Sequence, residues 1–208
     1  MRWRSAMLNN PFSELPVSVE IDGVSHPINS DFRFGIAMEM EVLSEGEPDV
    51  AGLLTSFYPG GVPVNVQAAA DKMLDFYKGH ALLTGENNAK NDKKGRQYDY
   101  EKDADVLVAS FLNTYRVDLT QDKLHWWVFR RLMLNLPDDS PFMQRVHYRV
   151  VDLNKVDKKL QKHYRKMKSL YALKSTHTGG PMTVEERDAA LKEKIRRRYE
   201  EAQNGKGS

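Results

Sequence analysis

Four carboxylates stand at every second position between residues 99 and 105, a spacing that resembles the start of a calcium-binding loop. They are Asp99, Glu101, Asp103 and Asp105. A loop of this kind requires Gly at its sixth position and Glu at its twelfth, whereas this sequence has Ala104 and Ser110 there. We therefore expect an acidic first helical turn, stabilised by the positive end of the helix dipole, in preference to a calcium site.

Other motifs that would indicate catalysis or cofactor binding are missing. The six histidines fall in no H-E-x-x-H or H-x-E arrangement, and no glycine-rich phosphate loop or G-x-S-x-G motif is present. Without cysteine the chain cannot form a disulfide, a thiolate metal site or a cysteine nucleophile. We interpret His125, which precedes two tryptophans, as a structural histidine at the edge of the core. The sequence thus predicts no catalytic residue, no metal ligand, no cofactor and no enzymatic activity.

Two adjacent tryptophans and two adjacent arginines stand in one strongly apolar segment, at 126–127 and 130–131. On a helix neighbouring residues point about 100° apart, so Trp126 and Trp127 can both be buried only where other elements cover two faces. Core packing explains the pair. The alternative is an interface anchor, because Trp and Arg are enriched among binding hot spots. Under that alternative Trp126, Trp127, Arg130 and Arg131 contact a partner.

The net charge of +2 conceals an uneven distribution of charge. Residues 143–208 hold 17 Lys and Arg against 8 Asp and Glu, while the remainder holds 14 basic and 21 acidic residues. A basic amphipathic stretch is usually a solvated face, and its functional alternative is a docking surface for an acidic or helical partner or for nucleic acid. The candidate contacts in this stretch are Lys162, Arg165, Lys168 and Tyr171.

Hydrophobic periodicity predicts a mainly α (α+β) fold, a helical domain with a small N-terminal β-hairpin and a basic C-terminal helix. The hairpin is expected over residues 17–28, with Asp22-Gly23 as a type I′ turn. The first helix is expected to present Phe32, Ile36, Met40 and Leu43 on one face. Further helices are expected near residues 50–57, 65–78, 104–115 and 124–134, a mobile loop at 84–97, and a stripe formed by Val156, Leu160, Tyr164, Met167 and Tyr171.

Three segments complete the expected organisation. Residues 142–151 are ambiguous between helix and extended chain. A Gly/Pro hinge at 176–181 precedes a basic amphipathic helix that opens on a Thr183-x-x-Glu186 capping box.

The longest uncharged run, 50–70, is broken by proline and glycine and so fails as a membrane span, which needs about 20 predominantly apolar residues. No apolar stretch of a signal peptide is visible near Met1, which predicts an intracellular protein.

Several phrases together resemble a known family. The most specific are Asn-Ser-Asp-Phe-Arg at 29–33 and Leu-His-Trp-Trp at 124–127. The others are Pro-Val-Ser-Val with Ile-Asp-Gly near the N-terminus, and Tyr-Arg-Lys-Met-Lys with Tyr-Ala-Leu at 164–173. In their order they resemble a small family from tailed bacteriophages and prophages of Gram-positive hosts, named after gene product fifteen of one such phage. The resemblance covers residues 8–173, as one helical domain, and leaves 174–208 outside. Gly35 stands where we expect a bulky residue, which predicts a helix weakened by about 1 kcal/mol relative to Ala.

Members of that family are typically encoded just before the tape-measure protein. The resemblance therefore implies a tail-assembly chaperone that keeps the tape-measure protein soluble and helps to recruit tube subunits. It implies the tape-measure protein as partner, the major tail tube protein as a second partner, and action in the host cytoplasm without retention in the mature virion. Self-association stays open, and neither nucleic acid nor membrane is expected as a partner. The alternatives are a nucleic-acid-binding helical module and a minor structural virion protein.

Overall fold

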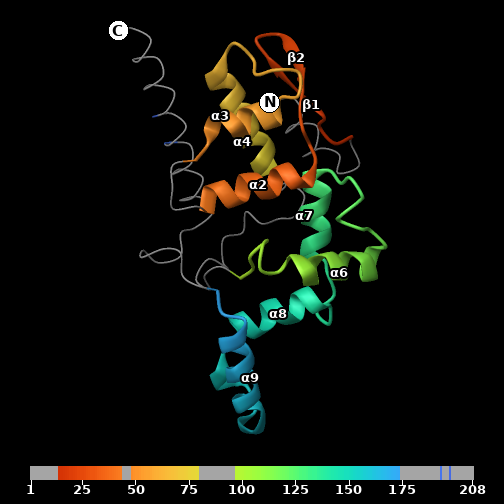
Figure 1. The fold of residues 1–208 in the computed structure, drawn as a ribbon, viewed down its shortest axis with the longest axis vertical. Coiled ribbons are helices and arrows are strands. Elements are labelled where there is room, and N and C mark those ends of the chain that lie inside the picture. Colours follow the sequence, from red (N-terminus) through yellow and green to blue (C-terminus); the bar gives the residue numbers. More distant parts are fainter. Residues whose placement is uncertain (1–13, 44–47, 80–96, 174–192, 194–196, 198–208) are drawn as a thin grey trace. The chain divides into compact units, whose positions relative to one another are not determined.

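A computed structural model describes residues 14–43, 48–79 and 97–173, together with the single helical positions 193 and 197. In this part of the chain, seven α-helices and one two-stranded antiparallel hairpin confirm the mainly α fold with an N-terminal hairpin (Figure 1). The expected mobile loop, apart from Gln97, lies outside the described residues. So do the expected hinge and C-terminal helix, apart from positions 193 and 197.

The chain divides into two compact units, which we describe separately. Unit 1 contains the described residues 14–43, 48–79 and 123–132. Unit 2 contains the described residues 97–122 and 133–173.

The hairpin of unit 1 follows the sequence prediction. Strand β1 (Ser18–Ile21) pairs with β2 (Val24–Pro27), and Ile21 stands opposite Val24 next to the turn. Asp22 and Gly23 have positive φ angles of 50° and 80°, as a type I′ turn requires. Val19 and Ile21 alternate with exposed neighbours and turn into the core, so the hairpin covers one side of the helices.

The helices of unit 1 are α2 (Phe32–Leu43), α3 (Val50–Phe57), α4 (Val66–Gly79) and most of α7 (Trp126–Leu134). Their existence confirms the periodicity. On the expected apolar face of α2, Phe32 is buried and Ile36 and Met40 are half-buried, while the Leu43 side chain lies outside the described residues. Phe34 and Met38, which the expected face left out, are also buried. The reason is the large indole of Trp126, which packs onto the Gly35 side of α2 and turns that side inward.

Unit 2 is built from α6 (Ala104–Tyr115), α8 (Pro141–Val150), the 3-10 helix η2 (Leu153–Lys155) and α9 (Lys158–Leu170). The ambiguous segment is therefore a helix. Ser140 caps it by accepting a hydrogen bond from the Met143 amide at 3.4 Å, and Pro141 occupies the first turn, where its missing N–H costs nothing. The Phe142 amide donates to the Ser110 hydroxyl at 3.1 Å, which ties α8 to α6.

Candidate functional site

The two tryptophans cap the end of a neighbouring helix. Both are fully buried in unit 1. The indole N–H of Trp126 donates to the Tyr77 carbonyl at 3.1 Å, and that of Trp127 donates to the Phe76 carbonyl at 2.8 Å. These carbonyls belong to the last turn of α4, where carbonyl groups lack partners within the helix. Core packing is therefore the alternative that the structure supports for this pair.

Each indole lies directly against a glycine. A Cβ atom at Gly35 would lie 2.1 Å from Cδ2 of Trp126, and one at Gly79 would lie 2.1 Å from Cζ2 of Trp127. Both distances are far below van der Waals contact. Gly35 is thus a packing requirement of α2, where the sequence suggested only a weak position.

We expect Gly35→Ala to destabilise unit 1, although Ala is the better helix former by about 1 kcal/mol. The added methyl group meets a buried ring that is hydrogen-bonded to α4, and overpacking of this kind costs about 1–3 kcal/mol. Urea denaturation followed by tryptophan fluorescence measures the change. Gly60→Ala is the control, expected to change stability by less than about 0.5 kcal/mol, because its nearest neighbour would be Pro27 Cγ at 3.5 Å. A Gly35→Ala protein as stable as the parent would contradict this packing.

His125 connects three segments of unit 1. Its Nδ1 accepts a hydrogen bond from the Trp127 amide at 3.1 Å, so Nε2 carries the proton and donates to the Pro16 carbonyl at 3.0 Å. Two backbone hydrogen bonds flank it, from Phe32 to Leu124 at 2.9 Å and from Trp126 to the Ser30 carbonyl at 2.7 Å. The two most specific sequence phrases, 29–33 and 124–127, therefore pair with each other, and His125 has the structural role that we expected.

Burial lowers the pKa of His125, and its hydrogen bond to the Pro16 carbonyl offsets this only in part. The unfolded chain, with a histidine pKa near 6.5, therefore binds a proton more readily than the folded chain does. We expect the free energy of unfolding to fall as pH drops below about 6.5 toward the lower folded-state pKa. Urea titrations at pH 8 and pH 5 measure this. In His125→Asn, whose amide oxygen can replace Nδ1 as the acceptor of the Trp127 amide, the difference in unfolding free energy between pH 8 and pH 5 is expected to shrink. An unchanged difference would show that His125 is not its source.

An open hollow of about 650 Å³ lies beside the paired phrases in unit 1. Asp31, Arg33, Lys123 and His125 are the titratable residues in its lining. Asp31 and Arg33 pair with each other at 3.2 Å, so two of its charges are already compensated.

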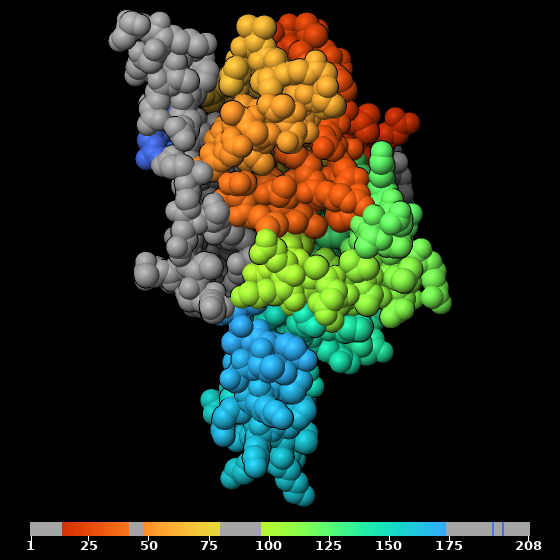
Figure 2. Space-filling view, in the orientation of Figure 1, coloured from red at the N-terminus to blue at the C-terminus, as the bar shows by residue number. Residues whose placement is uncertain are grey.

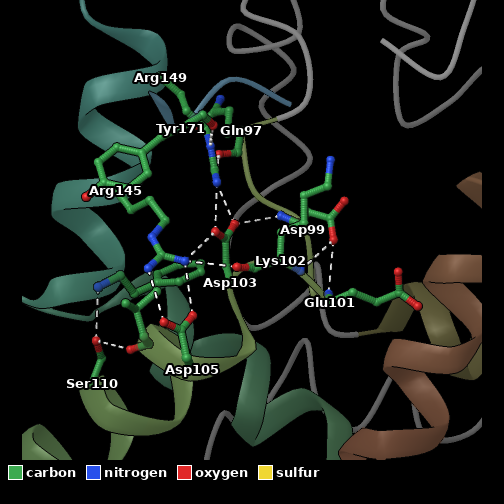
Figure 3. Close-up of polar contacts among 12 residues, drawn as sticks. Gln97, Asp99, Glu101, Lys102, Asp103, Asp105, Ser110, Arg145, Arg149 and Tyr171 are labelled. Atoms are coloured by element: carbon green, nitrogen blue, oxygen red, sulfur yellow. Dashed lines mark hydrogen bonds and ion pairs between the residues drawn. The ribbon is translucent and has the colours of Figure 1, made fainter. Parts of the chain in front are cut away.

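A buried carboxylate organises unit 2 (Figure 3). Asp103, 1% exposed, stands at the N-terminus of α6 and faces Arg145 and Arg149 of α8. Arg149 Nη2 donates to Asp103 Oδ1 at 2.7 Å, and the Asp99 amide donates to Asp103 Oδ2 at 2.9 Å. Burial raises the pKa of Asp103, but the hydrogen bonds from Arg149, the Asp99 amide and Arg145, together with the charge of Arg149, outweigh it and hold the pKa below its usual range.

Sequence reasoning expected the acidic turn but missed its arginine partners. Arg145 also binds Asp105 with both Nη atoms, at 3.0 and 3.2 Å. Asp99 accepts hydrogen bonds from the amides of Glu101 and Lys102, both at 3.0 Å. The signal that could have revealed the network is the spacing of four between Arg145 and Arg149, which places both on one helical face. Three carboxylates of the calcium-like pattern therefore have structural roles: Asp103 and Asp105 bind arginines, and Asp99 holds the turn before α6.

The same arginines fix the end of α9. Arg149 Nε donates to the Tyr171 carbonyl at 2.6 Å, and the Arg145 guanidinium lies 5.3 Å from the centre of the Tyr171 ring. That ring stacks on Tyr148 of α8. Lys168 donates to the Val151 carbonyl at 2.7 Å. Lys168 and Tyr171, two of the predicted partner contacts, are thus engaged inside unit 2.

Much of α9 is exposed in the described part of unit 2. No residue of α9 is buried, and on the face seen in Figure 2 no other element of unit 2 covers it. The helix carries six Lys and Arg and no Asp or Glu. Lys162 and Arg165 are exposed. Leu160, a member of the expected stripe, and Leu170 are also 51% and 65% exposed.

The eight predicted contact residues differ in their exposure. Trp126, Trp127 and Arg130 are buried in unit 1, which leaves them no surface to offer a partner in this structure. Arg130 Nη1 lies 3.7 Å from Glu39 Oε2, and the Arg130 guanidinium lies over the Trp126 ring. Arg131 is exposed on α7. Partner contact by Arg131, Lys162 and Arg165 stays a prediction.

Comparison with known proteins identifies the family. The sequence model of the family described as bacteriophage Gp15 protein matches residues 12–173, close to the region in which we noted the resemblance. Neither the curated proteins nor the solved structures contain a match. Among the described residues, every helix is too short or too polar to cross a bilayer. Because the match covers more than half of its residues, this chain belongs to the bacteriophage Gp15 protein family.

Proposed function

We propose that this protein is a non-catalytic tail-assembly factor that binds the tape-measure protein during phage morphogenesis. The observation that carries the proposal is α9, a basic helix with no buried residue and two exposed leucines. Membership of a phage family supports the setting of tail assembly. The major tail tube protein is the second proposed partner. The proposed site of action is the host cytoplasm, before the mature virion forms.

A binding role of this kind has a physical rationale. A long helical rod exposes apolar stripes, which aggregate unless another molecule covers them during synthesis. Many copies of a small helical protein along one rod act together through multivalency, so each contact need not be strong. An exposed helix such as α9 can cover one stripe segment per copy.

Co-expression with the tape-measure product of the same locus tests the proposal. We expect this chain to raise the soluble fraction of that product. The double variant Lys162→Glu with Arg165→Glu is expected to lose most of the effect, because both side chains are exposed on α9. Lys123→Glu, an exposed position of unit 1, is the matched control and should keep the effect. An unchanged soluble fraction with the parent chain would contradict the proposal.

The six cations of α9 also favour a second candidate function, nucleic-acid binding. Each phosphate contact releases counterions, so the affinity for a DNA duplex would fall steeply with salt. A gel-shift titration with a short duplex at low salt distinguishes the two candidates. Absence of a shift there eliminates nucleic-acid binding and leaves the assembly role unaffected.

A further inference from the structure

Four residues of α9 form a partly exposed stripe. Leu160, His163, Met167 and Leu170 follow one another at spacings of three, four and three. At 100° per residue they lie within about 80° of the helix circumference. The two leucines are exposed and Met167 is half-buried. His163 is exposed but its ring also meets the Tyr148 ring of α8 edge to face, with ring centres 6.0 Å apart. This alternation of three and four is the spacing of a coiled-coil seam.

The two borders of the stripe differ. On one side Tyr164 and Tyr171 pack against Tyr148 of α8, with ring centres 5.4 and 6.0 Å apart. On the other side stand the exposed Lys159 and Lys166, with Lys162 beyond them. The lysine side chains have no ion-pair partner among the residues that the structure describes, and α9 contains no carboxylate.

We propose that this stripe is the binding site for an acidic amphipathic α-helix. The apolar residues of the partner would lie on Leu160 and Leu170, and its Asp or Glu residues would face the lysines. Contacts with these three lysines select the partner and speed its association. Burial of the leucines supplies most of the affinity. This inference rests on the proposed function only for the source of the helix, which is the tape-measure protein.

Other occupants fit the stripe less well. A nucleic-acid backbone would meet the lysines but leave the leucines in water. A second copy of α9 would bring six further cations against the first six. A lipid surface is bound by a broad apolar face, whereas here the tyrosines that would widen the stripe are packed on α8.

Fluorescence anisotropy with designed peptides tests the site directly on the full chain. The probe is a fluorescein-labelled helical peptide of roughly three heptads, with Leu at positions a and d and Glu at e and g. The control peptide has Lys in place of Glu. We expect the acidic peptide to bind at least about tenfold more tightly than the basic one. Equal binding of the two peptides would overturn the proposal.

Paired variants locate the binding. We expect Leu160→Ser with Leu170→Ser to weaken binding of the acidic peptide about tenfold. Val64→Ser, at a fully exposed position of unit 1, should not change it. Lys159→Glu with Lys166→Glu should reverse the preference toward the basic peptide. Because all these side chains are exposed, circular dichroism melts should stay unchanged, and parent-like binding by the leucine variant would overturn the proposal.

Competition and co-expression separate this inference from the proposed function. A DNA duplex or an anionic phosphatidylglycerol vesicle that displaces the acidic peptide from α9 at comparable charge concentration would overturn the inference. If the leucine variant still raises the soluble fraction of the tape-measure product, the inference fails while the proposed function stands. If the acidic peptide binds α9 but co-expression has no effect, the inference stands and the proposed function fails.

Discussion

Replacing Trp127 by Ala is expected to lower the free energy of unfolding by about 3–5 kcal/mol. The indole is fully buried, and it fills the space left by the absent side chain of Gly79. Its removal leaves a cavity in unit 1. It also leaves the Phe76 carbonyl at the end of α4 without its 2.8 Å hydrogen bond, which adds the cost of an unsatisfied buried acceptor. A loss of this size is a large fraction of the stability of an ordinary domain.

Urea denaturation followed by far-ultraviolet circular dichroism measures this effect. Trp127→Phe is the informative intermediate, because it keeps most of the ring and loses the N–H donor, and it should fall between the parent and Trp127→Ala. Arg131→Ala, an exposed position on the same helix, should cost less than about 1 kcal/mol. An unchanged denaturation midpoint in Trp127→Ala would show that the capping arrangement is wrong.

Asp103→Asn is expected to have a comparable effect on unit 2, about 3–5 kcal/mol. The substitution removes the negative charge that Arg149 faces, and the Arg149 side chain is only 7% exposed. An arginine cannot lose its proton in response, so a buried guanidinium is left without a counter-charge. The same arginine holds the Tyr171 carbonyl, so α9 should loosen as well.

Asp105→Asn is the matched control for this prediction. It faces Arg145, but its side chain is 69% exposed, and we expect a loss below about 1 kcal/mol. Hydrogen exchange should show faster exchange in α6, α8 and α9 of Asp103→Asn. Removing both partners, as in Asp103→Asn with Arg149→Met, should recover part of the loss. If Asp103→Asn and Asp105→Asn cost the same, the buried pair does not stabilise unit 2.

The pKa of Asp103 adds a test at acidic pH. The folded-state pKa of Asp103 lies below the unfolded value of about 3.9. Its contribution to the free energy of unfolding is therefore present above pH 4 and is lost as pH falls through the folded-state pKa. Asp103→Asn should therefore flatten the acid denaturation curve below pH 4. This window is separate from that of His125, which lies below pH 6.5.

Local sequence signals predicted the elements well. The Asp22-Gly23 turn depends only on the φ angles of these two residues. The helices could be predicted because their apolar residues follow the 3.6-residue period. The sequence left two alternatives for Trp126 and Trp127, burial in the core or exposure as an interface anchor. Burial is possible because Gly35 and Gly79 on other helices leave room for the two indoles. No local pattern indicates which glycine lies against which indole.

The arginine network was missed because its one sequence signal, the spacing of four, depends on a helix that was not predicted. Arg145 and Arg149 share a face only if their segment is helical, and that segment was ambiguous until Ser140 was seen to cap it. The binding face of α9 was anticipated as a basic amphipathic stretch. Which of its residues are open to a partner depends on the packing of α9 in unit 2. That packing engages Lys168 and Tyr171 and leaves Leu160 exposed.

The central proposal is that α9 is the surface that meets the partner, and hydrogen exchange of the full chain with and without the co-purified tape-measure protein tests it directly. We expect slower amide exchange across residues 158–170 in the complex, with little change in the hairpin of unit 1. Protection confined to unit 1, with exchange in 158–170 unchanged, would contradict it.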